Sequence, residues 1–258
     1  MLLLLSPAKS LDYASPLPEI ATIDRTSRPR FAEEALSTAQ AAAKLGARKL
    51  GKLMAISDKL AALNAGRYAW FAEQEERAAL YAFSGDVYVG FEARTLDDPA
   101  IGFAQDHVRI LSGLYGLLRP LDRIRPYRLE MGTRWAPGRP KNLYQLWGGK
   151  ISDALAADLL AEGSDTIINC ASKEYWHAVE QAPPKGVRIV SIDFREDGPD
   201  GLIFNSFGAK RARGMMARWM CEHRITEPEA LKGFDSDGYA FRADGSDAAT
   251  WRFVKSRA

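Results

Sequence analysis

Short apolar runs alternate along the chain with longer segments that have one apolar face. Leu2–Leu5, TIINC from Thr166, VRIVSIDF and GLIFNSF are short and apolar, and we expect them to form buried strands. The turn-rich sequence EDGPDG between the last two predicts a β-hairpin. Two further β-like runs, GYAFR and TWRFV, lie around ADGS in the tail. Strands are therefore expected near both ends of the chain and throughout its last third.

The longer segments predict helices. The run FAEEALSTAQAAAKL, which begins at Phe31, consists largely of strong helix formers. A second helical region follows, and Ser57 is positioned to cap a new helix within it. The apolar face of this region consists of Leu50, Leu53, Met54, Leu60 and Leu63.

Three more helices are expected further along the chain. Asp98-Pro99 is typical of a helix start, and the apolar spacing after it predicts a helix from Asp98 to Ser112. From Leu143 the spacing predicts another helix, which Gly163 ends. Phe207–Arg224 is the third. The apolar face of the first consists of Ile101, Ala104, Val108 and Leu111.

The order of these elements indicates the fold class. Helices and strands mix without a regular β-α-β alternation, which favours the α+β class over a doubly wound parallel sheet. No internal repeat and no low-complexity linker divides the 258 residues. We therefore expect residues 1–258 to form a single compact domain, in which helices surround a mixed sheet.

Composition narrows the class of protein. Hydrophobic residues make up 47% of the chain and charged residues 26%, as in ordinary globular proteins. The net charge of +2 does not predict a polyanionic partner, so anion binding must depend on how charge is distributed. The leucines at Leu2–Leu5 are too few for a secretory signal, and no run approaches the ~20 apolar residues of a membrane span. We expect a cytoplasmic protein with no membrane partner.

The sequence offers no pattern typical of a cofactor or metal site. His107, His177 and His223 are scattered, and Cys170 and Cys221 are isolated, so we expect no dedicated metal and two reduced thiols. Neither a Walker loop nor a G-x-G-x-x-G motif is present. No cofactor is expected.

The densest group of positive charge lies between Arg109 and Arg134. Guanidinium groups present planar forks of donors that match phosphate or carboxylate oxygens. The arginines therefore predict an anion-facing surface; the alternative is an internal network with Asp122 and Glu130. They are Arg109, Arg119, Arg123, Arg125, Arg128 and Arg134. Among them, Arg123 and Arg125 are the favoured phosphate contacts, whereas Arg128 is the one expected to be held inside.

A second basic element is the segment FGAKRARGMMARW in the helix predicted for Phe207–Arg224. Lys210, Arg211 and Arg218 are expected on the side opposite the buried face of this helix. A basic solvated helix face is common, so this segment alone indicates little. Together with the first group, it predicts two basic elements that line one cleft.

Several sequence blocks carry a resemblance to a known family. SPAKSLDY, LMAISDKLAALNAGR, GDVYVGF, LSGLYGLLRPLDRIRPYRLEMG, NLYQLW, INCASKEY and AKRARGMM occur in that order from Met1 to about Tyr239. They resemble the YaaA family of bacterial peroxide-stress proteins. The resemblance implies a cytoplasmic protein that limits damage from iron and peroxide. It also implies an α+β fold with a helix-hairpin-helix-like element and a basic cleft that binds duplex DNA, with no established reaction.

The resemblance directs the DNA hypothesis to particular residues. In a helix-hairpin-helix, glycine N–H groups in a tight turn contact phosphate, and Gly113 and Gly116 are the candidates here, although Leu114 and Tyr115 separate them. Binding through phosphates is expected to be largely independent of base sequence. The predicted contacts are Arg109, Gly113, Gly116, Arg119, Arg123, Arg125, Lys210, Arg211, Arg213 and Arg218.

An enzyme acting on a small anionic substrate is the less favoured alternative. The resembling blocks contain more ionisable side chains than a DNA clamp needs, and a lysine or tyrosine among them could serve as acid or base if they converge. Dispersal of these side chains would exclude that pocket. The candidates are Lys9, Asp12, Asp86, Tyr127, Arg128, Glu130, Asn169, Ser172 and Lys210.

Overall fold

A mixed sheet lies at the centre of the protein. The computed structural model describes residues 1–22 and 25–256. Within them, eight strands form one sheet in the order β4-β3-β1-β6-β7-β10-β9, with β8 paired to β7, and a separate small sheet pairs β2 with β5. The strands are β1 Leu2–Leu5, β2 Arg77–Ala78, β3 Val108–Ser112, β4 Gly116–Leu118, β5 Arg123–Ile124, β6 Thr166–Asn169, β7 Arg188–Gly198, β8 Gly201–Ile203, β9 Tyr239–Arg242 and β10 Thr250–Lys255.

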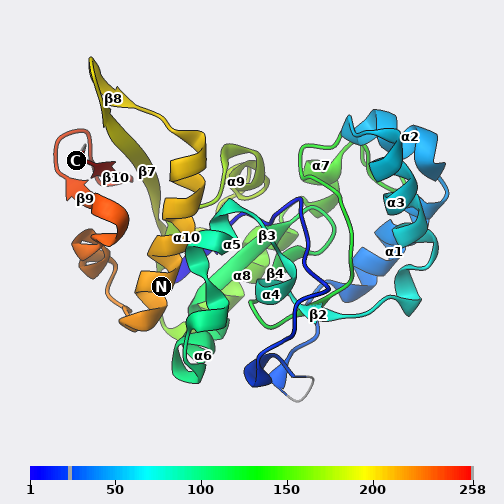
Figure 1. The fold of residues 1–258 in the computed structure, drawn as a ribbon, viewed down its shortest axis with the longest axis horizontal. Helices are drawn as coiled ribbons and strands as arrows, with labels where there is room; N and C mark the ends of the chain where they lie inside the picture. The colour runs from blue at the N-terminus through cyan, green and yellow to red at the C-terminus, as the bar shows by residue number, and fades with distance from the viewer. Residues whose placement is uncertain (23–24, 257–258) are drawn as a thin grey trace.

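Helices surround this sheet in two groups (Figure 1). α5 and α6 pack against α10, which also contacts β1 and β7, whereas α8 and α9 pack together and contact β4 and β3. A mixed sheet with surrounding helices confirms the α+β class. The helices are α1 Ala32–Ala43, α2 Gly46–Met54, α3 Asp58–Ala69, α4 Ala79–Ala82, α5 Asp86–Phe91, α6 Asp98–His107, α7 Leu143–Trp147, α8 Lys150–Glu162, α9 Lys173–Glu180 and α10 Ser206–Glu222.

The four leucines of β1 occupy the middle of the sheet. β1 pairs in parallel with β3 on one side and with β6 on the other. Leu2–Leu5 are fully buried. Parallel strands that are covered on both faces have continuous apolar runs instead of alternating ones, which explains the sequence of this strand. The amino group of Met1 is held 2.5 Å from Glu162 Oε1, so the start of the chain is fixed inside the fold.

Several local predictions are confirmed. Ser57 caps α3, because its side-chain oxygen accepts a hydrogen bond from the Leu60 N–H. Gly163 ends α8 in the left-handed conformation. β7 and β8 form the predicted hairpin, and β9 and β10 pair antiparallel. The helix predicted from Leu143 is divided into α7 and α8, since Gly148, with φ +48°, interrupts it.

The helix predicted from Asp98 to Ser112 is wrong in its second half. α6 ends at His107, and the residues from Val108 onwards form β3, between β1 and β4. Val108 and Leu111 have helical spacing from Ile101, but they belong to a short apolar run in which every residue is buried. Periodicity alone cannot distinguish a short buried strand from a continuing helix.

Gly113 and Gly116 do not lie between two helices. Gly113 lies in the connection between the antiparallel strands β3 and β4, and Gly116 is the first residue of β4. Gly116 has φ +68°, and a Cβ there would stand 2.7 Å from the ring of Trp147, so only glycine fits. The helix-hairpin-helix predicted at these two glycines is therefore not formed there.

α1, α2 and α3 pack on one another at one end of the molecule. Figure 1 shows them at the end opposite β8, β9 and β10. α2 and α3 are joined by the three residues 55–57, in which Ala55 has a left-handed conformation with φ +49°. These two helices form a tight helical hairpin, which we call the basic helix pair (residues 46–69).

Candidate functional site

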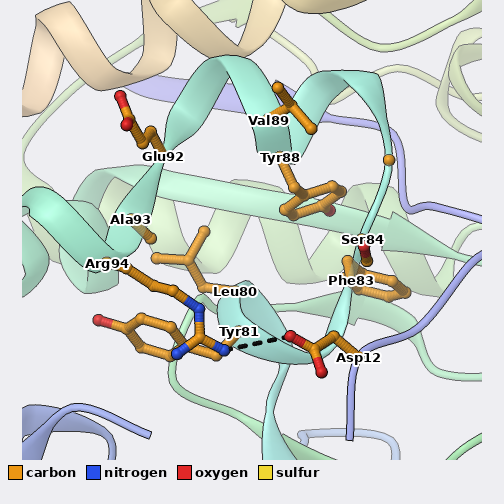
Figure 2. A pocket seen from close by; sticks show the side chains of 11 residues that line it. Asp12, Leu80, Tyr81, Phe83, Ser84, Tyr88, Val89, Glu92, Ala93 and Arg94 are labelled. Atoms are coloured by element: carbon orange, nitrogen blue, oxygen red, sulfur yellow. Dashed lines mark hydrogen bonds and ion pairs between the residues drawn. The ribbon is translucent and has the colours of Figure 1, made fainter. Parts of the chain in front are cut away.

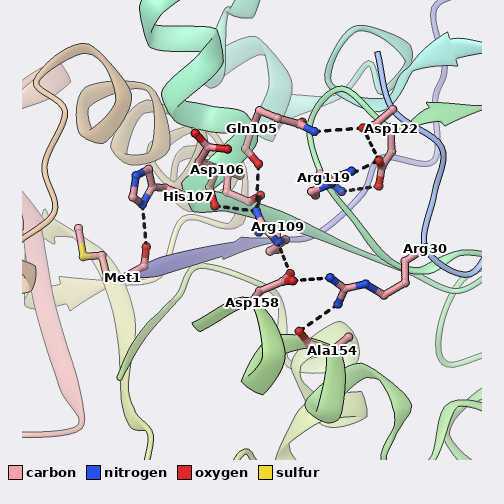
Figure 3. Close-up of polar contacts among 12 residues, drawn as sticks. Met1, Arg30, Gln105, Asp106, His107, Arg109, Arg119, Asp122, Ala154 and Asp158 are labelled. Carbon is pink, nitrogen blue, oxygen red and sulfur yellow. Dashed lines mark hydrogen bonds and ion pairs between the residues drawn. The ribbon is translucent and has the colours of Figure 1, made fainter. Parts of the chain in front are cut away.

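Arg109 points into the protein (Figure 3). It is 5% exposed, and its Nε donates to Asp158 Oδ2 at 2.7 Å. Its Nη1 donates to the carbonyl oxygens of Gln105 and Asp106 at 3.1 and 2.9 Å. Burial alone would raise the pKa of Asp158, but hydrogen bonds from Arg109 and Arg30 outweigh burial and hold that pKa below its usual range. Arg109 is structural, which corrects its assignment to the DNA contacts.

Most of the arginine stretch, residues 109–134, is paired in the same way. Arg119 Nε lies 3.6 Å from Asp122 Oδ1, and Asp122 is only 2% exposed. Arg123 and Arg125 share one carboxylate, that of Glu76, at 3.5 and 2.8 Å. These arginines form the internal network that the sequence left open as the alternative to an anion-facing surface.

The basic residues of α10 divide between two environments. Arg218 faces α5, where its Nη1 donates to the carbonyl oxygen of Glu92 at 2.9 Å and to Thr95 Oγ1 at 2.7 Å. Arg211 is exposed, as is Arg134 in the arginine stretch, and neither has a hydrogen-bond or ion-pair partner among the described residues. Lys210 and Arg213 point elsewhere, so the basic face predicted for this helix is not continuous.

The side chains proposed as a catalytic pocket lie in three separate places. The first is a hollow of about 270 Å³ beside Asp12 (Figure 2). Asp12 accepts from the N–H groups of Ala14 and Ser15 at 3.0 and 2.9 Å, and Arg94 Nη2 lies 3.3 Å away. The hydrogen bonds from Ser15, aided by those of Ala14 and the charge of Arg94, lower the pKa of Asp12 to about 2. Asp12 therefore stabilises the loop to which it belongs.

The second place surrounds Glu130 and has almost no free space. Lys9 Nζ and Arg128 Nη2 lie 3.4 and 3.0 Å from Glu130 Oε1. Tyr127 and Ser112 share a hydrogen bond of 2.6 Å, and burial raises the pKa of Tyr127 far above its ordinary value. The cavity at Lys9 and Glu130 measures about 10 Å³, less than one water molecule needs. Two cations therefore share one carboxylate, and the cluster leaves no room for a substrate.

The third place is a large cavity of about 1160 Å³, lined by Asn169, Ser172 and Lys210. Asn169 ends β6, and Ser172 is the residue before α9. Lys210 Nζ lies 3.7 Å from Asp86 Oδ2, so Asp86 is joined to this place through an ion pair. We call it the strand-end cavity. The nine candidates therefore do not converge, and this subset surrounds the largest of the three spaces.

Arg213 lines the strand-end cavity, although the sequence grouped it with the DNA contacts. Ser206, Lys210 and Arg213 follow one another at i, i+4 and i+7 on α10, which places them on one face of the helix. Arg213 Nε is buried without a hydrogen-bond partner among the described residues. Burial lowers the pKa of this guanidinium.

The sequence interpretation missed four exposed cations of the basic helix pair, which are Arg48, Lys49, Lys52 and Lys59, and Lys44 just before it. None of these five has an ion pair among the described residues. The remaining cation of the pair, Arg67, is half-buried and donates to Asn64 Oδ1. The available signal was a stretch, residues 44–57, that contains no carboxylate.

The two cysteine thiols are buried, and the possible metal ligands are dispersed within the described residues. Cys170 and Cys221 are free and buried, and burial raises the pKa of Cys170 to about 12, so this thiol stays protonated near neutral pH. Within residues 1–22 and 25–256, no three His, Cys, Asp or Glu side chains are grouped as metal ligands. In that same part of the chain, no helix has both the length and the apolar run that crossing a bilayer requires.

The fold and its charged surfaces define an α+β protein with a large polar cavity and a separate basic helical hairpin. The sequence profile of the family described as Peroxide stress protein YaaA matches residues 1–245. The chain belongs to this family.

Curated relatives agree with this assignment and extend over the whole chain. A UPF0246 protein of Rhizorhabdus wittichii is 83% identical over 257 residues, covering 100% of both chains. A UPF0246 protein of Chromobacterium violaceum is 46% identical over 262 residues, again covering 100% of both. A third, from Paracidovorax citrulli, is 48% identical over 250 residues and covers 95% of each chain.

Proposed function

We propose that this member of the peroxide-stress family binds duplex DNA through the basic helix pair, largely without base preference, and so protects DNA from iron and peroxide damage. The observation that carries the proposal is the group of exposed, unpaired cations on α2 and around it, in a protein whose net charge is only +2. Free Lys and Arg side chains that neutralise phosphates supply most of the affinity of non-specific DNA binding.

The spacing of these cations supports the proposal. Arg48 and Lys52 lie four residues apart and so on one side of α2, and Lys49 lies beside them. Lys44 precedes α2, in the turn where Gly46 has φ +70°. Like charges at this spacing destabilise a helix by about 0.2–0.5 kcal/mol for each pair. An arrangement that costs stability, with no carboxylate to relieve it, is expected where an external anion supplies the missing charge.

The turn between the two helices offers a second kind of hydrogen-bond donor to phosphate. The first turn of α3 leaves backbone N–H groups without acceptors inside the helix, and Ser57 Oγ satisfies that of Leu60. The positive end of the helix dipole favours an anion at this position, where Asp58 in the first turn already supplies one negative charge. We infer that α2, residues 55–57 and α3 are the helix-hairpin-helix-like element implied by the family resemblance, in place of the connection at Gly113 and Gly116.

The test is duplex affinity across a salt series for wild type and the triple variant Arg48→Ala, Lys49→Ala, Lys52→Ala. Each phosphate contact contributes about 0.9 to the slope of log affinity against log salt, so removing three should reduce the slope by about 2.7. Affinity at physiological salt should fall by at least about tenfold. The three side chains are exposed, so folding should be unaffected.

Lys185→Ala is the matched control, because Lys185 is also exposed and has no ion-pair partner among the described residues. It should bind like wild type. Unchanged affinity and slope in the triple variant would remove the basic helix pair from the interface, and the proposal with it.

A further inference from the structure

The strand-end cavity lies where the chain connections change direction. β1 leads to β3 on one side, whereas its neighbour β6 leads through α9 to β7 on the other. In sheets with parallel central strands, ligands bind beyond the carboxyl ends of the strands at such a switch point. The loops after β1 and β6 meet here, since the Ser172 N–H donates to Ser6 Oγ at 2.8 Å.

The cavity has the size and lining of a small-molecule site. Its volume of about 1160 Å³ is slightly above the usual range of roughly 300–1,000 Å³ for ligand pockets. Polar and aromatic side chains from β6, α9, α10 and the segment after β8 surround it. Those on which the argument depends are Asn169, Ser172, Trp176, Phe204, Lys210 and Arg213.

Arg213 is the feature that most requires a ligand. Almost every other arginine that the structure buries is held by carboxylates or carbonyl oxygens, as Arg109 is. Arg213 has neither an ion pair nor a hydrogen bond among the described residues, and its Nε is buried. A desolvated charge without a partner is costly for a folded protein. A bound oxyanion would supply both the counter-charge and acceptors for the guanidinium fork.

No lining carboxylate lies within ion-pair distance of Arg213. Asp193 acts on the Arg213 guanidinium through space, but it is ion-paired with Arg195 and Arg252. Lys173 is a further lining cation without a partner among the described residues. The lining carries four cations and three carboxylates, so its formal charge is +1 with His177 neutral.

Aromatic surface is available in the same cavity. Phe204 is 55% exposed, an unusual position for a phenylalanine, and its ring lies 5.4 Å from the guanidinium of Arg195. Trp176, on α9, contributes a second ring to the lining. Accessible aromatic rings stack on planar bases in nucleic-acid sites.

We propose that the strand-end cavity binds a nucleoside phosphate, with the phosphate on Arg213 and Lys210 and the base on Phe204 and Trp176. Ser172, whose hydroxyl oxygen accepts from Ser6 Oγ, has its own proton left to donate to the sugar. Asn169 supports the wall, because its Oδ1 accepts from the Ala171 N–H and its Nδ2 donates to Ser191 Oγ. This site is separate from the proposed DNA surface and does not depend on it, because its residues come from β6, α9 and α10, and not from the basic helix pair.

The experiment is calorimetric titration of the full chain with AMP, ribose 5-phosphate, inorganic phosphate and adenosine. AMP should bind most tightly, the two smaller phosphates more weakly, and adenosine most weakly. Arg213→Gln should weaken AMP binding by about ten- to hundredfold, as expected for loss of charge-assisted hydrogen bonds. Arg211→Gln, an exposed site on the other side of the same helix, should leave it unchanged.

Thermal unfolding provides the folding control. Without ligand, Arg213→Gln should melt no lower than wild type, because it removes an unpaired charge. AMP should raise the melting temperature of wild type and of Arg211→Gln, but not of Arg213→Gln.

Three results would overturn the proposal: no AMP binding by wild type at millimolar concentration, equal AMP affinity in Arg213→Gln, or displacement of AMP by duplex DNA. The last would mean that phosphates of the polymer occupy the cavity. Loss of duplex binding in the triple variant of the basic helix pair, with AMP binding intact, separates this site from the proposed function.

Discussion

Two basic regions of this protein use their charge in opposite ways. In the arginine stretch, all the arginines except Arg134 turn toward carboxylates or carbonyl oxygens, and Arg109 is almost completely buried. In the basic helix pair, Arg48, Lys49 and Lys52 are exposed and unpaired among the described residues. The first region has the higher density of arginine, but the second offers more free positive charge to a partner.

The difference shows that a count of cations does not locate a polyanion surface. A guanidinium can donate several hydrogen bonds in a plane, so arginine is suited to internal networks that join distant segments. A cation is free to bind a partner only if no carboxylate lies within reach of it in the folded chain. Glu76 alone receives both Arg123 and Arg125, the two residues that the sequence favoured as phosphate contacts.

The largest expected effect is a difference between the two regions in how much one side chain contributes to the free energy of unfolding. Arg109→Met should lower the free energy of unfolding by about 3–5 kcal/mol, because it leaves Asp158 partly buried without its main partner. Arg48→Met should change it by less than about 0.5 kcal/mol. Urea unfolding measures both. Similar losses in the two variants would mean that the regions do not differ as described.

A smaller effect is expected from Arg123→Ala combined with Arg125→Ala. The pairs with Glu76 are partly exposed, so the loss of stability should be about 1 kcal/mol. The salt slope of duplex binding should stay at the wild-type value. A decrease of about 1.8, which corresponds to two phosphate contacts, would instead place both arginines on the DNA and restore the sequence interpretation.

A third effect concerns Asp12, whose ion pair with Arg94 lies outside both basic regions. Asp12→Asn should cost about 1 kcal/mol near neutral pH. The pKa of Asp12 is lowered to about 2, mainly by hydrogen bonds from Ser15. A lowered pKa stabilises the fold above the unfolded-state value, and this advantage is lost as pH falls through the folded value.

The stability difference between wild type and Asp12→Asn should therefore be complete at about pH 5–7 and decline from about pH 4 until it is lost near pH 1. Unfolding free energies measured across this range provide the check. A full difference that persists at about pH 1 would show that the carboxylate charge is not what stabilises the loop.

Local features of the fold were largely predictable. Residues Leu2–Leu5, Ser57 and Gly163 carry signals that depend on their immediate neighbours, and the structure confirms a strand, an N-cap and a C-cap there. Prediction failed at Val108–Ser112, where the same apolar spacing fits a helix or a buried strand. Only pairing with β1 and β4 decides between them.

The candidate site was predictable only in part. Asn169, Ser172 and Lys210 were selected as polar residues of the resembling blocks, and they do surround one cavity. Asp12 and Glu130 were selected on the same grounds, but each is enclosed by its own partners. The sequence contains no sign of this division, because it also depends on partners that are distant along the chain: Arg94 for Asp12 and Lys9 for Glu130.

By itself, the sequence determined the strands, caps and helices whose signals are local, the α+β class, and the family to which the chain belongs. Tertiary structure alone decided which cations are free. Arg109 forms an ion pair with Asp158, and Arg125 forms one with Glu76; in each pair the two residues are 49 positions apart along the chain. The attraction between charges depends on their separation in space and on their burial, and neither quantity can be read from the order of the residues.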